Sequence, residues 1–324
     1  MSAVLRILVV LCLAGTPAAA QTDYPARPVT MVVPFAAGGP LDVVARIVAD
    51  AMAKHFGQPI VIENISGAGG TIGATRVARA AADGYTLLMY HIGMATTPAL
   101  YRGRLPYDPM RDLVPVTLVN EVPMALVARK DFPARSLAEF VALLRAQGRT
   151  LNVAHAGIGS ASHLCSLLLM TELNAQISTV PYRGTSLAMN DLVSGQVDAI
   201  CDLVTNAAPQ IQGAKINAYA VTGTQRIVAL DEVPTARESG LPGLDMTNWN
   251  AVFAPRDTPL PVVERVVQAL SAALNDPVVV SRLAAIGTRP IEEMRRGVSQ
   301  LRSHLAAEIA RWTPIIERSG QFAE

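Results

Sequence analysis

The residues best suited to chemistry lie in two glycine-rich turns near the start of the chain. Residues 36–40 follow the apolar run 28–35 and precede an amphipathic run over 41–56. Residues 64–73 follow a second apolar run and also precede a helical pattern. Such a turn leaves backbone N–H groups unpaired at a helix N-terminus, where the helix dipole adds partial positive charge. The turns therefore predict a site for a carboxylate or a phosphate.

A third turn of the same kind reads Gly-Ile-Gly-Ser-Ala-Ser-His over residues 157–163. It follows a short apolar run and precedes a helical pattern, so its N–H groups also face the carboxyl edge of a predicted parallel sheet. Ser160 and Ser162 add hydroxyl donors. Two facing N–H clusters suit a ligand carboxylate clamped between them.

Three alternative functions have less support from the sequence than anion binding: hydrolysis, dinucleotide binding and metal binding. A serine hydrolase would need G-x-S-x-G, but Ile158 stands where the first glycine of that pattern would precede Ser160. A dinucleotide fold would need glycine at Ile72. His155 and His163 are eight residues apart, with no H-E-x-x-H and no paired C-x-x-C to support a metal site. We therefore predict no catalytic residues, no cofactor and no metal.

The elements that position these turns alternate along the chain. Short apolar runs at 60–62, 86–89, 116–119, 125–128, 151–154, 179–182, 197–201, 218–221 and 251–254 read as strands, with helical patterns between most of them. Such alternation predicts an α/β fold with parallel sheets. The C-terminal part is predicted to be helical. Asp276 is its expected helix cap, and Pro314 is expected to kink or break the last helix.

The N-terminus has the pattern of an exported protein. A positive charge at Arg6, an apolar run over 7–13 and small residues up to Ala20 predict a signal peptide over residues 1–20. No later run is long and apolar enough for a membrane helix. The net charge of +1 gives no basic surface for nucleic acid. We therefore expect a soluble, exported protein.

Two cysteines, Cys165 and Cys201, remain after cleavage. In an oxidising compartment they can form a disulfide, because right-handed winding brings both to the same end of a parallel sheet. Two buried free thiols are the alternative.

An ordered set of motifs resembles the periplasmic solute-binding proteins of tripartite tricarboxylate transporters, the Bug family. The matching stretches run through nearly the whole predicted mature chain: residues 24–28, 33–39 with Asp42, 63–64, 67–70, 72–73, 83–87, 105–109, 181–184, 195–197, 220–222, 233–235 and 254–255. The resemblance implies a two-lobed, type II-like binding protein with a ligand cleft between α/β lobes. It implies lobe 1 over residues 21–122 and 252–324, and lobe 2 over 123–251.

The resemblance also places ligand contacts in two loops, residues 35–42 of lobe 1 and residues 157–163 of lobe 2. In lobe 1, Asp42 would organise the loop and His91 and Gly93 would lie beside the cleft. Lobe 2 offers further candidates at strand ends, which include Thr185 and Thr205, and Arg183 there could pair with a second carboxylate. The predicted ligand-binding residues are Phe35, Ala36, Ala37, Gly38, Gly39, His91, Gly93, Gly157, Gly159, Ser160, Ala161, Ser162, His163, Tyr182, Arg183, Asp202 and Asn206.

The expected ligand is a small organic carboxylate, either a dicarboxylate, a tricarboxylate or an aromatic carboxylate such as terephthalate. The expected partners are the membrane permease subunits of a tripartite tricarboxylate transporter, and the protein is expected to be a monomer. A binding protein that serves a membrane sensor instead of a transporter remains the alternative, since both need the same cleft and closure.

Overall fold

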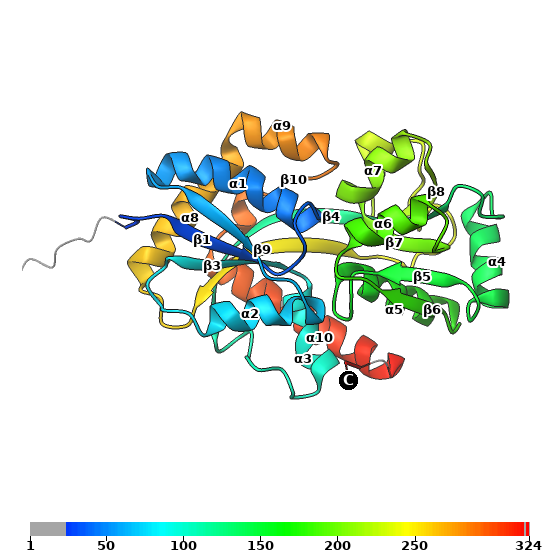
Figure 1. The fold of residues 1–324 in the computed structure, drawn as a ribbon, viewed down its shortest axis with the longest axis horizontal. Helices are drawn as coiled ribbons and strands as arrows, with labels where there is room; N and C mark the ends of the chain where they lie inside the picture. The colour runs from blue at the N-terminus through cyan, green and yellow to red at the C-terminus, as the bar shows by residue number, and fades with distance from the viewer. Residues whose placement is uncertain (1–23, 321, 324) are drawn as a thin grey trace, which may run out of the picture.

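The computed structural model describes residues 24–320, 322 and 323, so the predicted signal peptide lies outside the described residues. Figure 1 shows two α/β halves side by side, connected by two long strands. We call the half that begins the described chain lobe 1 and the other half lobe 2. Among the described residues, no helix has the length and apolar character needed to cross a membrane.

Lobe 1 begins with three strands and three helices in alternation. The strands are β1 (Val29–Val33), β2 (Ile60–Asn64) and β3 (Thr86–His91), and the helices are α1 (Pro40–Phe56), α2 (Thr71–Ala78) and α3 (Gly93–Tyr101). The strands pair in parallel in the order β2-β1-β3. Because parallel strands end at the same edge, the turns that follow β1 and β3 lie at one edge of the sheet.

Lobe 2 repeats this alternation. Its elements are α4 (Leu137–Gln147), β5 (Asn152–His155), α5 (Ala161–Leu173), β6 (Ser178–Pro181), α6 (Thr185–Val193), β7 (Ala199–Leu203), α7 (Val204–Gln212) and β8 (Ile216–Val221). Strand β5 pairs in parallel with both β6 and β7. The turns before α5, α6 and α7 therefore lie at one edge of this sheet too.

The two long strands are β4 (Leu113–Arg129) and β9 (Thr247–Pro255). The first part of β4 pairs antiparallel with β9 up to Pro123, and its last part pairs antiparallel with β7 and β8 from Met124 and Ala125. The expectation of two separate strands at 116–119 and 125–128 is wrong, since one strand runs through both. Pro123 lies where the pairing changes, so its missing N–H interrupts neither sheet interior. Each sheet is therefore mixed, with parallel pairs away from β4 and β9.

Three helices follow β9 and return to lobe 1: α8 (Leu260–Asn275), α9 (Pro277–Ala285) and α10 (Val298–Ser319). Between α9 and α10 lie the short strand β10 (Arg289–Pro290) and a 3-10 turn at Glu293–Arg295. The predicted cap is confirmed, because the Asp276 side chain accepts a hydrogen bond from the Val278 N–H. The predicted break at Pro314 is wrong, because α10 runs through it. Pro314 and Ala310 are both exposed, so water can bind the carbonyl that the proline leaves unpaired.

The large apolar core fills lobe 1 and continues into lobe 2, where a second cluster packs under α6 and α7. A disulfide joins Cys165 of α5 to Cys201 of β7, which decides between the two alternatives left open by the sequence. The bridge ties α5 to the sheet of lobe 2 close to the point where both elements approach lobe 1.

Candidate functional site

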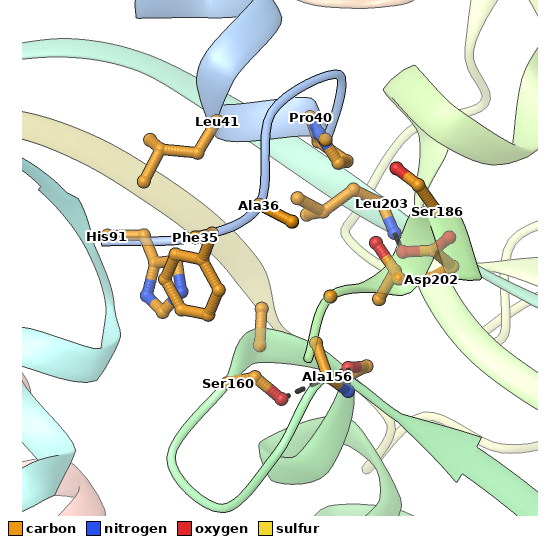
Figure 2. Close-up of a pocket in the computed structure, with 15 residues that line it drawn as sticks. Phe35, Ala36, Pro40, Leu41, His91, Ala156, Ser160, Ser186, Asp202 and Leu203 are labelled. Carbon is orange, nitrogen blue, oxygen red and sulfur yellow. Dashed lines mark hydrogen bonds between the residues drawn. The ribbon is translucent and has the colours of Figure 1, made fainter. Parts of the chain in front are cut away.

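A cavity of about 40 Å³ lies between the two lobes. Its walls come from the turn before α1, from the end of β3, and from the turns before α5, α6 and α7 (Figure 2). The residues lining it are Phe35, Ala36, Gly39, Pro40, Leu41, His91, Ala156, Ser160, Ala161, Ser162, Gly184, Thr185, Ser186, Asp202 and Leu203. The first turns or caps of four helices thus meet at one small space. No lysine or arginine is among these described lining residues.

The lobe 1 wall is held by the buried carboxylate of Asp42. Its Oδ2 accepts hydrogen bonds from the Gly38 N–H at 2.8 Å and from Arg46 Nε at 2.9 Å, and its Oδ1 accepts one from Asn64 Nδ2 at 2.9 Å. Burial opposes ionisation, but these hydrogen bonds prevail and hold the pKa of Asp42 below its usual value. Asn64 Nδ2 also donates to the Phe35 carbonyl at 3.1 Å. The network fixes both ends of the turn, so that α1 presents its first N–H groups to the cavity.

The wall from α5 is organised by two serines. Ser160 caps the helix by accepting a hydrogen bond from the His163 N–H, and Ser162 Oγ accepts one from the Ala156 N–H at 2.9 Å. The two hydroxyl oxygens are 3.1 Å apart and share one hydrogen bond. Since two hydroxyl hydrogens serve one shared bond, one hydrogen is left for a ligand. The N–H groups of Ala161 and Ser162 lie in the first turn and have no intrahelical partner.

Helices α6 and α7 complete the wall of lobe 2. Gly184 caps α6 with φ 156°, and Thr185 and Ser186 form the first positions of that helix. Leu203 caps α7 directly after Asp202. Helix α6 adds further first-turn N–H groups at the cavity, and α7 adds its cap residue. A small anion here would meet backbone donors and helix dipoles in place of cationic side chains.

His91 supplies a neutral donor on the lobe 1 side. Its Nδ1 accepts a hydrogen bond from the Gly93 N–H at 2.8 Å, so the ring hydrogen is on Nε2. Burial lowers the pKa of His91 to about 3, which keeps the ring uncharged at neutral pH. The Phe35 ring stacks on it with centroids 4.7 Å apart, and the two rings face the cavity together (Figure 2).

Asp202 is the carboxyl group in the cavity wall, opposite Phe35 and His91 (Figure 2). It is fully buried at the end of β7. Burial raises its pKa to about 6, although hydrogen bonds from Asn206, the Leu203 N–H and Thr185 oppose that rise. The Leu203 N–H bond measures 2.8 Å. At neutral pH this residue is therefore mostly an ionised hydrogen-bond acceptor.

The two lobes touch on either side of the cavity. Ser186 Oγ donates a hydrogen bond to the Gly38 carbonyl at 3.3 Å. At Gly69, in the turn before α2, an added Cβ would lie 1.8 Å from the Ile158 carbonyl oxygen of lobe 2. Such close backbone approaches show that the structure has the lobes closed around the cavity.

The structure brings many of the predicted residues to the cavity but not all of them. Phe35, Ala36, Gly39, His91, Ser160, Ala161, Ser162 and Asp202 line it. Ala37 and Gly38 are exposed and do not line the cavity. Also outside the lining are three buried residues, Gly93, Gly159 and His163, and two half-buried ones, Gly157 and Asn206. His163 is buried with its Nδ1 accepting from the Gly159 N–H, and burial lowers its pKa to about 3. These residues shape the turns.

Tyr182 and Arg183, which the sequence analysis expects to contact the ligand, do not line the cavity. The Tyr182 hydroxyl donates to Asp191 at 2.6 Å, and Arg183 is exposed. The extended backbone at Gly184 turns the chain so that the next residues, Thr185 and Ser186, face the cavity instead. Pro40 and Leu41 lie in the predicted lobe 1 loop, and Thr185 was a predicted strand-end candidate. Sequence reasoning missed Ala156, Gly184, Ser186 and Leu203. The strand-glycine-helix pattern at Gly184 was a signal that could have found two of them.

A family model and several solved structures are similar to this chain over most of its length. The family model described as "Tripartite tricarboxylate transporter family receptor" matches residues 44–321. The solved periplasmic binding protein BugD is 41% identical with a TM-score of 0.89, and the match covers 93% of this chain and 100% of that one. MatC from Rhodopseudomonas palustris, solved with bound malate, is 44% identical with a TM-score of 0.87, covering 90% and 100%. A second R. palustris protein, solved with adipate, is 35% identical with a TM-score of 0.86, covering 92% and 99%.

These similarities confirm the predicted family and the two-lobed α/β binding-protein fold. They also confirm that the chain is not an enzyme, because the family consists of binding proteins. With a family model that matches most of its length, the chain belongs to the receptor family of the tripartite tricarboxylate transporters.

Proposed function

We propose that this chain is a periplasmic solute-binding protein that captures a small organic carboxylate and delivers it to the membrane subunits of a tripartite tricarboxylate transporter. The observation that carries the proposal is the cavity between the lobes, which is lined by the first turns or caps of four helices. Backbone N–H donors at helix starts recognise a carboxylate without a cationic side chain. Binding without a charged partner also allows release when the lobes separate.

The ligand is a compact aliphatic dicarboxylate. Relatives with 44% and 35% identity were solved with malate and adipate, which are both aliphatic dicarboxylates. Donors occur on both sides of the cavity, so each carboxylate of such a ligand has its own partners.

The two lobes move as units, lobe 1 over residues 24–122 and 252–323 and lobe 2 over residues 123–251. The change of pairing along β4 between Pro123 and Met124 supports this division. Ligand contacts from both lobes favour the closed arrangement, because only that arrangement forms all of them. We expect a monomer exported by the signal peptide at residues 1–20.

Calorimetry tests the function with malate, succinate, adipate, citrate and terephthalate. We expect saturable heat with at least one aliphatic dicarboxylate and no consumption of the ligand. The variant Ala161→Pro removes one N–H at the first position of α5, where proline fits a helix and where the preceding Ser160 is already extended, with ψ 158°. Affinity should fall about tenfold or more, since a ligand oxygen loses its donor.

Val298→Pro is the matched control. It removes the N–H at the corresponding first position of α10, a helix whose start does not line the cavity. Its affinity should equal that of the wild type. The proposal fails if no carboxylate binds the wild type, or if folded Ala161→Pro binds as tightly as Val298→Pro.

A further inference from the structure

Asp202 places a negative charge inside a cavity otherwise built to hold anions. The side chain is fully buried, lines the cavity and forms no ion pair with the described residues. A ligand carboxylate placed directly against it would be repelled, because like charges interact strongly away from water. The residue therefore needs a different role from that of the helix N-termini.

The hydrogen-bond capacity of Asp202 is not filled by the protein. An ionised carboxylate offers about four acceptor positions. Donors to Asp202 are the Leu203 N–H, Asn206 Nδ2 and the Thr185 side chain. These three fix the orientation of the carboxylate and leave about one acceptor position. Because the group lines the cavity, we expect a bound ligand to reach that position.

Other polar groups around the cavity are hydrogen-bond donors or are already engaged. His91 presents Nε2–H, and the serines of α5 have one hydroxyl hydrogen to spare. First-turn N–H groups of α1, α5 and α6 are donors as well. A ligand made only of carboxylates and methylenes satisfies these donors but offers Asp202 nothing. A hydroxyl or ammonium group on the same ligand would supply the missing donor.

We propose that Asp202 is a specificity-determining residue that accepts a hydrogen bond from a hydroxyl or amino group of the ligand. The cavity then selects hydroxy- or amino-substituted dicarboxylates over unsubstituted ones of the same length. This inference rests on the proposed function and names the ligand class within it. The discrimination has a physical basis, since a site built to bond a hydroxyl rejects the analogue that lacks it by leaving its own buried group unpaired.

Malate and succinate test the inference, because they differ by one hydroxyl on the same four-carbon chain. Dissociation constants are measured by calorimetry for the wild type, Asp202→Asn and Asp191→Asn. We expect the wild type to bind malate at least about tenfold more tightly than succinate. Asp202→Asn should lower that ratio about tenfold or more, because the amide removes the repulsion and can donate to a carboxylate of succinate.

Asp191→Asn is the matched control, since it removes a lobe 2 carboxylate that bonds Tyr182 and does not line the cavity. It should keep the wild-type ratio. The inference is overturned if the wild type binds succinate as tightly as malate, a measurement that needs no variant to fold. It is also overturned if folded Asp202→Asn keeps the wild-type ratio. The proposed function survives both results, whereas a wild type that binds no carboxylate would overturn the proposed function and this inference together.

Discussion

Replacing Gly69 with alanine should weaken ligand binding much more than it destabilises the protein. Gly69 lies in the turn before α2 with φ 63°, and its carbonyl accepts a hydrogen bond from the buried Tyr90 hydroxyl at 2.7 Å. It does not line the cavity. Its importance comes from the other lobe, because an added Cβ would lie 1.8 Å from the Ile158 carbonyl oxygen. The substitution therefore acts on closure and not on a ligand contact.

The size of the effect follows from that distance. Real Cβ contacts are essentially never shorter than 3.0 Å, so the contact must open from 1.8 Å to at least 3.0 Å, a displacement of about 1.2 Å. Both partners are backbone segments, so no side chain can rotate away. A shift of this size lengthens ligand hydrogen bonds made by one lobe beyond bonding range. Losing one or two of them costs about 1 to 3 kcal/mol each, which lowers affinity at least about tenfold.

Gly57→Ala separates closure from backbone strain. Gly57 has φ 68° at the end of α1, and an added Cβ there meets nothing within 4 Å. Both variants should lose about 1 kcal/mol of stability from the left-handed conformation. Only Gly69→Ala should lose affinity in calorimetry and have a larger radius of gyration with saturating ligand in small-angle scattering. Equal affinities for the two folded variants would refute the idea that this contact forms in the bound state.

Three further predictions concern stability. Replacing Cys165 and Cys201 together with alanine should lower the free energy of unfolding by up to about 4 kcal/mol. This is the loop entropy that a crosslink between residues 36 positions apart removes from the unfolded chain. If the denaturation midpoint of the wild type is the same with and without reductant, the disulfide is contradicted. The raised pKa of Asp202, about 6, means that the ligand-free protein binds this proton more tightly than the unfolded chain does. Its contribution to stability should thus rise by about 2 kcal/mol as pH falls from about 7.5 to about 4.5. Asp202→Asn should lack this contribution. If the free energies of unfolding of the two proteins change with pH in the same way, the prediction is wrong. Asp42→Asn should lose about 1 to 3 kcal/mol in urea unfolding and several-fold in affinity, because Arg46 loses its charged partner and the turn before α1 loosens. Unchanged affinity would show that the turn does not need this support.

The alternation of strands, glycine turns and helices could be predicted from the sequence, because each of these elements is determined by a short stretch of chain. Gly39 and Ser160 stand where a strand has ended and a helix is about to begin, so the chain itself indicates that N–H groups of the first turn that follows each of them are free. The disulfide was one of two alternatives, since only the packing of α5 against β7 brings the two cysteines together. The features that a short stretch of chain determines by itself, such as the glycine turns before helices, were therefore predictable.

Features that depend on distant segments were not predictable in the same way. Arg183 was expected to pair with a ligand carboxylate because of its charge. The turn at Gly184 instead leaves Arg183 exposed and brings Ser186 to the cavity. Two apolar runs separated by Pro123 looked like two strands, whereas pairing with β9 on one side and β7 on the other makes them one. The closure contact at Gly69 depends on a carbonyl that is far away in the chain. No pattern around Gly69 indicates that partner.

The central claim is that first-turn N–H groups of helices hold the ligand carboxylates. Nuclear magnetic resonance of the ¹⁵N-labelled protein tests it by following the amide signals of Leu41, Ala161, Ser162 and Thr185 during titration with malate. We predict that these signals shift downfield together and saturate at one ligand per protein, while the Val298 amide stays in place. Saturable binding that leaves all four amide signals unmoved would contradict the account.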